Sequence, residues 1–92
     1  MEKLKFLLTI DCVFNILTKG LLVTGNVAEG KISLGDELEL RGDNGIIKVQ
    51  CVGLEKYCKP ITQAIQGEYI AVYLSGTSRE NVTKGMRLVL KE

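Results

Sequence analysis

Hydrophobic side chains recur at every second position along most of this chain, and that period strongly limits what the chain can fold into. In the first run Phe6, Leu8 and Ile10 would share one face of a strand. The same alternation recurs at Leu38 and Leu40, from Ile47 to Cys51, from Ile70 to Leu74, and at Leu88 and Leu90. Period two is the pattern of strands that bury one face. We therefore expect an all-β protein.

Turn signals containing glycine separate these runs at the spacing of a β-barrel. The expected turns are Thr18-Lys19-Gly20, Glu29-Gly30-Lys31 and Gly42-Asp43-Asn44-Gly45. Gly25, Gly30 and Gly35 are expected at corners, where a coiled strand bends or takes a positive φ, and Gly53 at a bulge. Asp36 is expected to cap backbone amides. The pattern predicts a small closed, Greek-key-like barrel of about six strands.

Two segments fall outside the alternation. Thr77 to Lys84 fits one short helical turn, because Thr77 and Glu80 have the spacing of a capping box and Gly85 follows as a stop signal. The segment 60–67, which begins with the single proline, is expected to be a loop or a brief helical turn.

The length of 92 residues indicates one domain, residues 1–92, and the composition excludes several functions. Twelve basic and eleven acidic residues give a net charge of +1, without the basic excess of a dedicated nucleic-acid binder. Any RNA contact must come from local placement of charge, and Lys48, Lys56 and Lys59 form the one local basic cluster in the sequence. The chain has no histidine, the commonest general base and a main metal ligand. We expect no enzyme, metal or cofactor.

Cys12, Cys51 and Cys58 form no CxxC pair and are odd in number. We interpret them as free thiols that fill the core in a reducing compartment. The apolar run near the N-terminus is interrupted by Thr9 and Asp11, and it is too short to span a membrane. These features predict a cytoplasmic protein that does not bind membranes.

The stretch VFNILTKGLLVTGNVAEGKISLGDELEL resembles the second domain of the translational GTPases, most closely that of elongation factor Tu. The matching residues are Val13, Phe14, Ile16, Gly20, Val23, Thr24, Gly25, Val27, Gly30, Ile32, Gly35 and Asp36. The likeness continues through VGLEKYCK, LSGTSRENVTKG and LVL, so it runs from Phe6 to Leu90. A phosphate loop ending in Gly-Lys-Ser/Thr is missing, so this chain alone is not expected to bind GTP. Met1 shortly before the first strand favours a free-standing barrel.

The resemblance implies a partner. In elongation factor Tu this domain holds the aminoacylated end of tRNA, and in related factors it contacts ribosomal RNA. The residues at the corresponding positions are Phe14, Ile16, Thr24, Glu55, Tyr57, Lys59 and Tyr69. Glu55 occupies the position that contacts the terminal adenosine, Tyr57 replaces a phenylalanine, and Tyr69 replaces an asparagine. These residues are the RNA-binding residues that the resemblance implies.

Other positions depart from the family. Cys12 stands in place of an aspartate, and arginine is lost at Asn26, Glu29, Cys58 and Ser75. Arginine binds phosphate through two parallel hydrogen bonds, so these changes weaken the tRNA interpretation. Two functions stay open: a non-catalytic module that binds RNA or the ribosome, and a protein-interaction module or homo-oligomer that has lost the tRNA site. The near-neutral charge and the outward-facing Tyr69 and Tyr73 favour the second.

Overall fold

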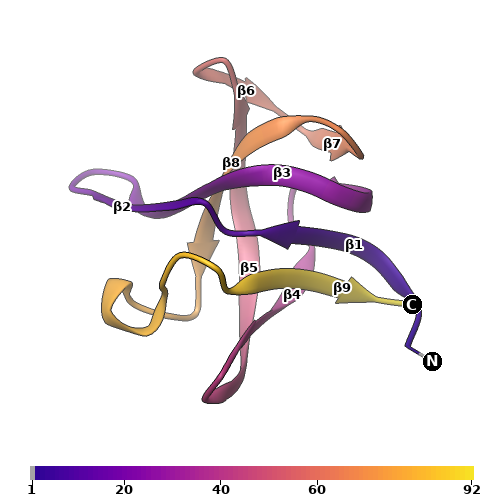
Figure 1. Cartoon of the computed structure of the whole chain (residues 1–92). Coiled ribbons are helices and arrows are strands. Elements are labelled where there is room, and N and C mark those ends of the chain that lie inside the picture. The colour runs from indigo at the N-terminus through magenta and orange to yellow at the C-terminus, as the bar shows by residue number, and fades with distance from the viewer. Residues whose placement is uncertain (1) are drawn as a thin grey trace.

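The computed structural model describes residues 2–92, which form strands joined by short turns (Figure 1). The strands are β1 Leu4–Thr9, β2 Cys12–Ile16, β3 Gly20–Ser33, β4 Glu37–Gly42, β5 Gly45–Lys56, β6 Lys59–Ile61, β7 Gln63–Ile65, β8 Tyr69–Ser75 and β9 Arg87–Lys91. A single 3-10 turn, η1, spans Arg79–Asn81. Within residues 2–92 no helix is long and apolar enough to cross a membrane. The all-β expectation is confirmed.

The strands close into a barrel. They follow the order β1-β9-β4-β5-β8-β3, and β3 also pairs with β1, so six antiparallel strands form a ring. The 14-residue β3 pairs with β8 and then β7 along one edge, and with β2 and then β1 along the other. Ile10 and Asp11 separate β1 from β2. The expected closed barrel is confirmed.

The barrel interior is filled by the side chains that the alternation places inward. The fully buried large side chains of this core are Phe6, Leu8, Ile10, Val23, Val27, Ile32, Leu40, Ile70, Val72, Val82 and Leu88. In a barrel of this size side chains fill the interior, so the centre is a packed core rather than a channel.

Close approach of β3 to β1 depends on glycine. Gly30 has a φ of +74°, and a Cβ atom there would lie 1.8 Å from the carbonyl oxygen of Lys5. Gly25 lacks a positive φ, but a Cβ atom there would lie 2.4 Å from the carbonyl oxygen of Thr9. Both glycines therefore let the backbones of β3 and β1 come together. The expected turn at Gly30 is a bend within β3, which continues to Ser33.

Two expected backbone features are present. The register shifts between Cys51 and Gly53, as a bulge requires. The backbone N–H of Ser33 donates to Asp36 Oδ2 at 2.8 Å, which is the expected cap.

Two other predictions were wrong. The segment 60–67 contains the short strands β6 and β7, which pair with β5 and β3, instead of a loop or helical turn. The helical turn near residue 80 is shorter than expected, and its N-cap is Ser78 without a side-chain cap bond. Thr77 and Glu80 therefore form no capping box. Val82, directly after this turn, is fully buried in the core. Because the Val82 side chain must reach the core, the 3-10 turn ends at Asn81.

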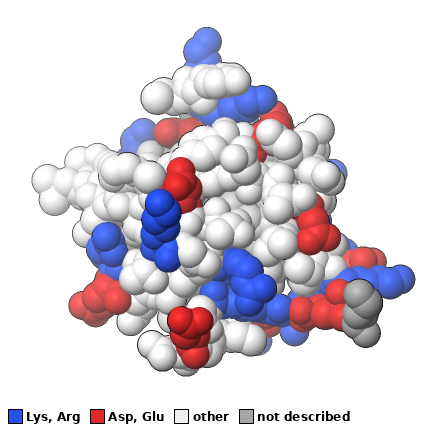
Figure 2. All heavy atoms as spheres, viewed as in Figure 1, with Lys and Arg blue, Asp and Glu red and all other residues white. Residues whose placement is uncertain are grey.

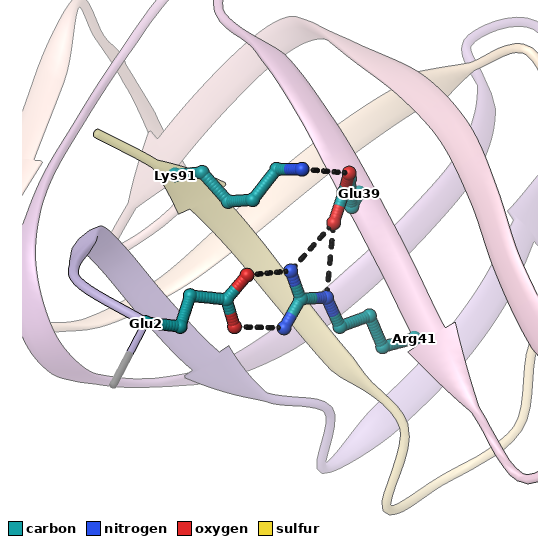
Figure 3. A network of polar contacts seen from close by, with 4 residues as sticks. All are labelled: Glu2, Glu39, Arg41 and Lys91. Carbon is teal, nitrogen blue, oxygen red and sulfur yellow. Dashed lines mark hydrogen bonds and ion pairs between the residues drawn. The ribbon is translucent and has the colours of Figure 1, made fainter.

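Polar side chains join the segment before β1 to β4 and β9 (Figure 3). Arg41 Nη1 lies 2.6 Å from Glu2 Oε1, and Arg41 Nη2 lies 2.7 Å from Glu39 Oε1. Lys91 Nζ lies 3.1 Å from Glu39 Oε2. Hydrogen bonds from Arg41 hold the pKa values of Glu2 and Glu39 below their usual value of 4.5, and Lys91 adds to this effect at both carboxylates. The segment before β1 lies beside the C-terminal residue here, where the backbone N–H of Glu92 donates to the carbonyl oxygen of Lys3 at 3.2 Å (Figure 1).

Gly30→Ala is expected to destabilise the barrel more than Gly20→Ala. Gly20 also has a positive φ, +93°, but nothing lies within 4 Å of a Cβ atom there. Gly20→Ala should therefore cost about 1–2 kcal/mol for the left-handed backbone alone, and Gly30→Ala roughly 1–3 kcal/mol more from overpacking. Urea unfolding followed by circular dichroism measures both. Equal losses of unfolding free energy in the two variants would show that the close approach of β3 to the Lys5 backbone does not affect stability.

Arg41→Met is expected to flatten the acid dependence of stability. Folding lowers the pKa values of Glu2 and Glu39. The stability that these two carboxylates add to the fold is therefore fully present above pH 4.5, and it is lost as the pH falls through their lower pKa values in the folded protein. Unfolding free energies of the wild type between pH 6 and about 2 should fall more steeply than those of Arg41→Met. Lys59→Met, which removes a charge on the distant β5–β6 hairpin, should follow the wild type; parallel curves for all three proteins would contradict the interpretation.

Candidate nucleic-acid interface

Four neighbouring strands, β2, β3, β8 and β5, present one outer face. The register places Phe14, Leu22, Tyr73 and Gly53 in one row across these strands. Cys12, Thr24, Ala71 and Glu55 form the next row. Since their sequence neighbours Val23, Val72 and Leu54 are buried in the core, both rows point outward. We call this surface the outer face.

Five of the residues that the resemblance implies lie on the outer face: Phe14, Ile16, Thr24, Glu55 and Tyr69. Phe14 is 49% exposed and Tyr69 is 46% exposed, so each leaves about half of its surface open to a partner. Ile16 lies opposite Gly20, at the end of the β2–β3 hairpin. The structure thus brings together residues that are far apart in the sequence.

Tyr57 and Lys59 lie elsewhere, on the hairpin that joins β5 to β6. Tyr57 and Cys58 form its turn with φ values of 54° and 63°, the left-handed pair of a type I′ turn. Tyr57 is 86% exposed, and the hairpin projects at the top of Figure 1. In the β5–β6 pairing Lys59 lies opposite Lys56, and the adjacent pair is Pro60 opposite Glu55. Lys59 therefore lies on the opposite side of the hairpin from Glu55.

The expected basic cluster is divided, because Lys56 and Lys59 lie opposite each other on the β5–β6 hairpin and Lys48 lies apart from them. Lys48 lies opposite Glu39 near the start of β5, and eight residues, roughly 25 Å of strand, separate it from Lys56. Lys56 forms an ion pair with Glu68, which raises the lysine's pKa and lowers the glutamate's. In the face shown in Figure 2, positive side chains are scattered among negative ones without forming a stripe, and some stand at the top beside the β5–β6 hairpin.

A polar cluster lies at the Tyr69 end of the outer face. The Tyr69 hydroxyl donates to Asp11 Oδ2 at 2.8 Å and lies 2.9 Å from Thr24 Oγ1. Thr24 lowers the pKa of Tyr69, but the hydrogen bond to Asp11, burial and the charge of Asp11 outweigh it, so the pKa is raised. Lys84 Nζ lies 3.8 Å from Asp11 Oδ1, beside a hollow of about 460 Å³.

Lys19 crosses the other end of the outer face. Its Nζ lies 3.5 Å from Glu55 Oε2 and 5.8 Å from the centre of the Tyr73 ring. Tyr73 points outward as expected, yet only 9% of it is exposed. Lys19, Asp11 and Lys84 were not predicted as site residues, because no local pattern in the sequence reveals their partners. Lys19 and Glu55 are 36 residues apart, and Asp11 and Tyr69 are 58 apart.

The cysteines divide into two kinds. Cys51 is buried in the core, and burial raises the pKa of its thiol. Cys12 and Cys58 are exposed, so the expectation that they fill the core was wrong. Cys12 points outward from the β2–β3 pair, and Cys58 occupies the hairpin turn, so neither can reach the core. Over residues 2–92, no group of three histidine, cysteine, aspartate or glutamate side chains is placed to hold a metal ion.

A closed six-stranded antiparallel barrel with a continuous outer face of aromatic, hydroxyl and carboxylate groups defines a small β-barrel domain of the translation-factor type. The family model of Elongation factor Tu domain 2 matches residues 20–89. The chain belongs to the Elongation factor Tu domain 2 family. The match contains Thr24, Glu55, Tyr57, Lys59 and Tyr69, whereas Phe14 and Ile16 precede it.

Asp11→Asn is expected to lower the pKa of Tyr69, because it removes the charge that favours the protonated hydroxyl. NMR titration of the tyrosine ring signals measures this, with Asp43→Asn in an exposed turn as the control. Folding raises the pKa of Tyr69. The stability that the protonated hydroxyl adds is therefore present below pH 10.0, and it is lost as the pH rises through the pKa of Tyr69 in the folded protein. Asp11→Asn should lack that alkaline loss. An unchanged Tyr69 pKa would contradict the role given to Asp11.

Proposed function

We propose that this barrel is a non-catalytic module of the cytoplasm that binds the single-stranded end of tRNA or a ribosomal RNA segment on its outer face. The observation that carries the proposal is the convergence of Phe14, Thr24, Glu55 and Tyr69 from four strands on one surface. Membership of the Elongation factor Tu domain 2 family supports a role in translation. GTP binding is not part of this proposal.

The chemistry of the outer face suits an unpaired strand of RNA. Phe14 and Tyr69 offer half-exposed rings on which a base can stack, and each such contact is worth about 1–3 kcal/mol. Thr24 and Glu55 offer hydroxyl and carboxylate groups for the sugar and base edges. Tyr57 and Lys59 lie beyond the outer face on the β5–β6 hairpin, where Lys59 is exposed on the side away from Glu55 and can contact a phosphate of a strand that passes over the hairpin. Stacking therefore contributes more than charge.

Phe14→Ala is expected to weaken RNA binding about 5- to 150-fold, the equivalent of ~1–3 kcal/mol. Fluorescence anisotropy with labelled single-stranded RNA, and filter binding with aminoacylated tRNA, deacylated tRNA and ribosomes, measure the affinity. Ile46→Ala, which truncates a side chain that is 58% exposed on β5 away from the outer face, is the control. Wild-type protein without affinity for any of these RNAs would overturn the proposal.

Lys59→Glu is expected to weaken RNA binding and to reduce its salt dependence, because it removes one phosphate contact. Lys48→Glu makes the same charge change at the distant end of β5 and should leave both quantities near the wild type. Equal effects of the two substitutions would show that only the overall charge matters and would remove Lys59 from the interface.

A second candidate function is protein interaction, and the edge of β2 favours it. Among residues 2–92, β2 pairs only with β3, and residues 12–18 carry no charged side chain. Leu17 is 100% exposed and Phe14 is 49% exposed along this edge. Uncharged strand edges invite pairing with another chain. A dimer in sedimentation analysis that Phe14→Lys dissociates, combined with absent RNA binding, would favour this function over the first.

A further inference from the structure

We infer that the tip of the β2–β3 hairpin docks into a hollow at one end of the barrel in a second copy of this chain, and that two copies do this reciprocally in a symmetric dimer. The hollow lies between the β4–β5 hairpin and the segment that contains η1, and it shares no residue with the two rows of the outer face. The inference goes beyond the proposed function and does not depend on RNA binding.

The hollow combines apolar side chains with one unpaired charge. It has a volume of about 250 Å³, and its lining residues include Leu40, Ile46, Ile47, Met86, Asn44 and Asn81. An apolar cavity of about 150 Å³ already holds benzene, so this hollow has room for one leucine side chain. Among the described residues that line it Glu80 alone is charged, and its carboxylate forms no ion pair within residues 2–92. The hollow therefore suits an aliphatic side chain with a cation close by.

The tip of the β2–β3 hairpin offers this combination. The backbone N–H of Lys19 donates to the carbonyl oxygen of Ile16 at 3.1 Å, which places Leu17 at the second position of a four-residue turn. Glycine, proline and short polar residues dominate turns, whereas Leu17 is apolar and 100% exposed. Leu17 therefore fills no space in its own barrel and is free to enter another.

Lys19 supplies the cation two residues after Leu17. Its side chain is 59% exposed, and its Nζ lies 3.5 Å from Glu55 Oε2. An exposed ion pair of this kind contributes little to stability, so Lys19 can exchange Glu55 for a carboxylate of a second copy. We assign that role to Glu80, which lines the hollow that Leu17 enters.

The hairpin and the hollow are placed for reciprocal docking. The η1 turn, which carries Glu80, packs beside β2. Figure 1 shows the β2–β3 hairpin and the orange-yellow loop that contains η1 on the same side of the barrel. One partner can therefore engage both features of a copy at once through a two-fold rotation. Such a contact closes at two copies instead of extending into a filament.

Charge reversal provides the sharpest test. Lys19→Glu and Glu80→Lys are each expected to weaken the dimer about tenfold in sedimentation equilibrium, because each brings like charges together at both contacts. An equimolar mixture of the two variants should regain the wild-type affinity, since every hairpin then meets a hollow of opposite charge. Glu29→Lys, which reverses an exposed carboxylate on β3, is the matched control and should behave as the wild type.

Leu17→Asp is expected to raise the dissociation constant of the dimer about 100-fold, because each of the two leucine contacts contributes about tenfold. Leu34→Asp is the matched control, since Leu34 is 49% exposed in a different turn, directly after β3. Leu34→Asp should leave the dissociation constant unchanged. Circular dichroism of each variant checks its fold.

The outcomes separate this inference from both candidate functions. A wild type that stays monomeric up to about 1 mM overturns the inference. A dimer that Leu17→Asp and both charge reversals leave intact also overturns it, and dissociation of that dimer by Phe14→Lys would assign it to the free edge of β2. A mixture of the two charge-reversal variants that stays as weak as each alone overturns the pairing of Lys19 with Glu80. Absent RNA binding overturns the proposed function and leaves the dimer standing.

Discussion

The close approach of β3 to β1 is the constraint on which the rest of the structure depends. Their pairing closes the barrel, and Gly25 and Gly30 make it possible because a side chain at either position would collide with the backbone of β1. Closure fixes the register of β3 against β8 and β2 as well. Because side chains alternate along strands, that register also decides which residues face outward.

Much of the outer face could be predicted from the sequence for this reason. The alternation that places Val23 and Val72 in the core also turns Thr24 and Tyr73 outward, whatever the details of the barrel. Cross-strand contacts could not be predicted in the same way. The pairing of Lys19 with Glu55 joins residues 36 positions apart, and it depends on how far the β2–β3 hairpin bends over its neighbours.

The predictions that were wrong concern features that depend on pairing between strands and leave no signal in the local sequence. β6 and β7 contain three residues each, too few to show a period, and pairing with longer strands is what makes them strands. The turn at Tyr57 and Cys58 lacks the glycine or asparagine that usually signals a type I′ turn. Without that signal, the side of the hairpin on which Lys59 lies could not be derived. Tyr73 is covered because of a bulge and a distant lysine, neither visible in the local pattern.

The placement of charge limits what phosphate contacts could add to the RNA binding proposed for this barrel. Lys19, Lys56 and Lys84 each lie within 4.0 Å of a carboxylate. A phosphate that recruits one of these lysines must displace that carboxylate, so the electrostatic gain is small. Aromatic stacking has no such competitor at Phe14, which is already half exposed. Under the proposed function, recognition on this face would therefore depend chiefly on unpaired bases, and charge would adjust the affinity by exchanging ion-pair partners.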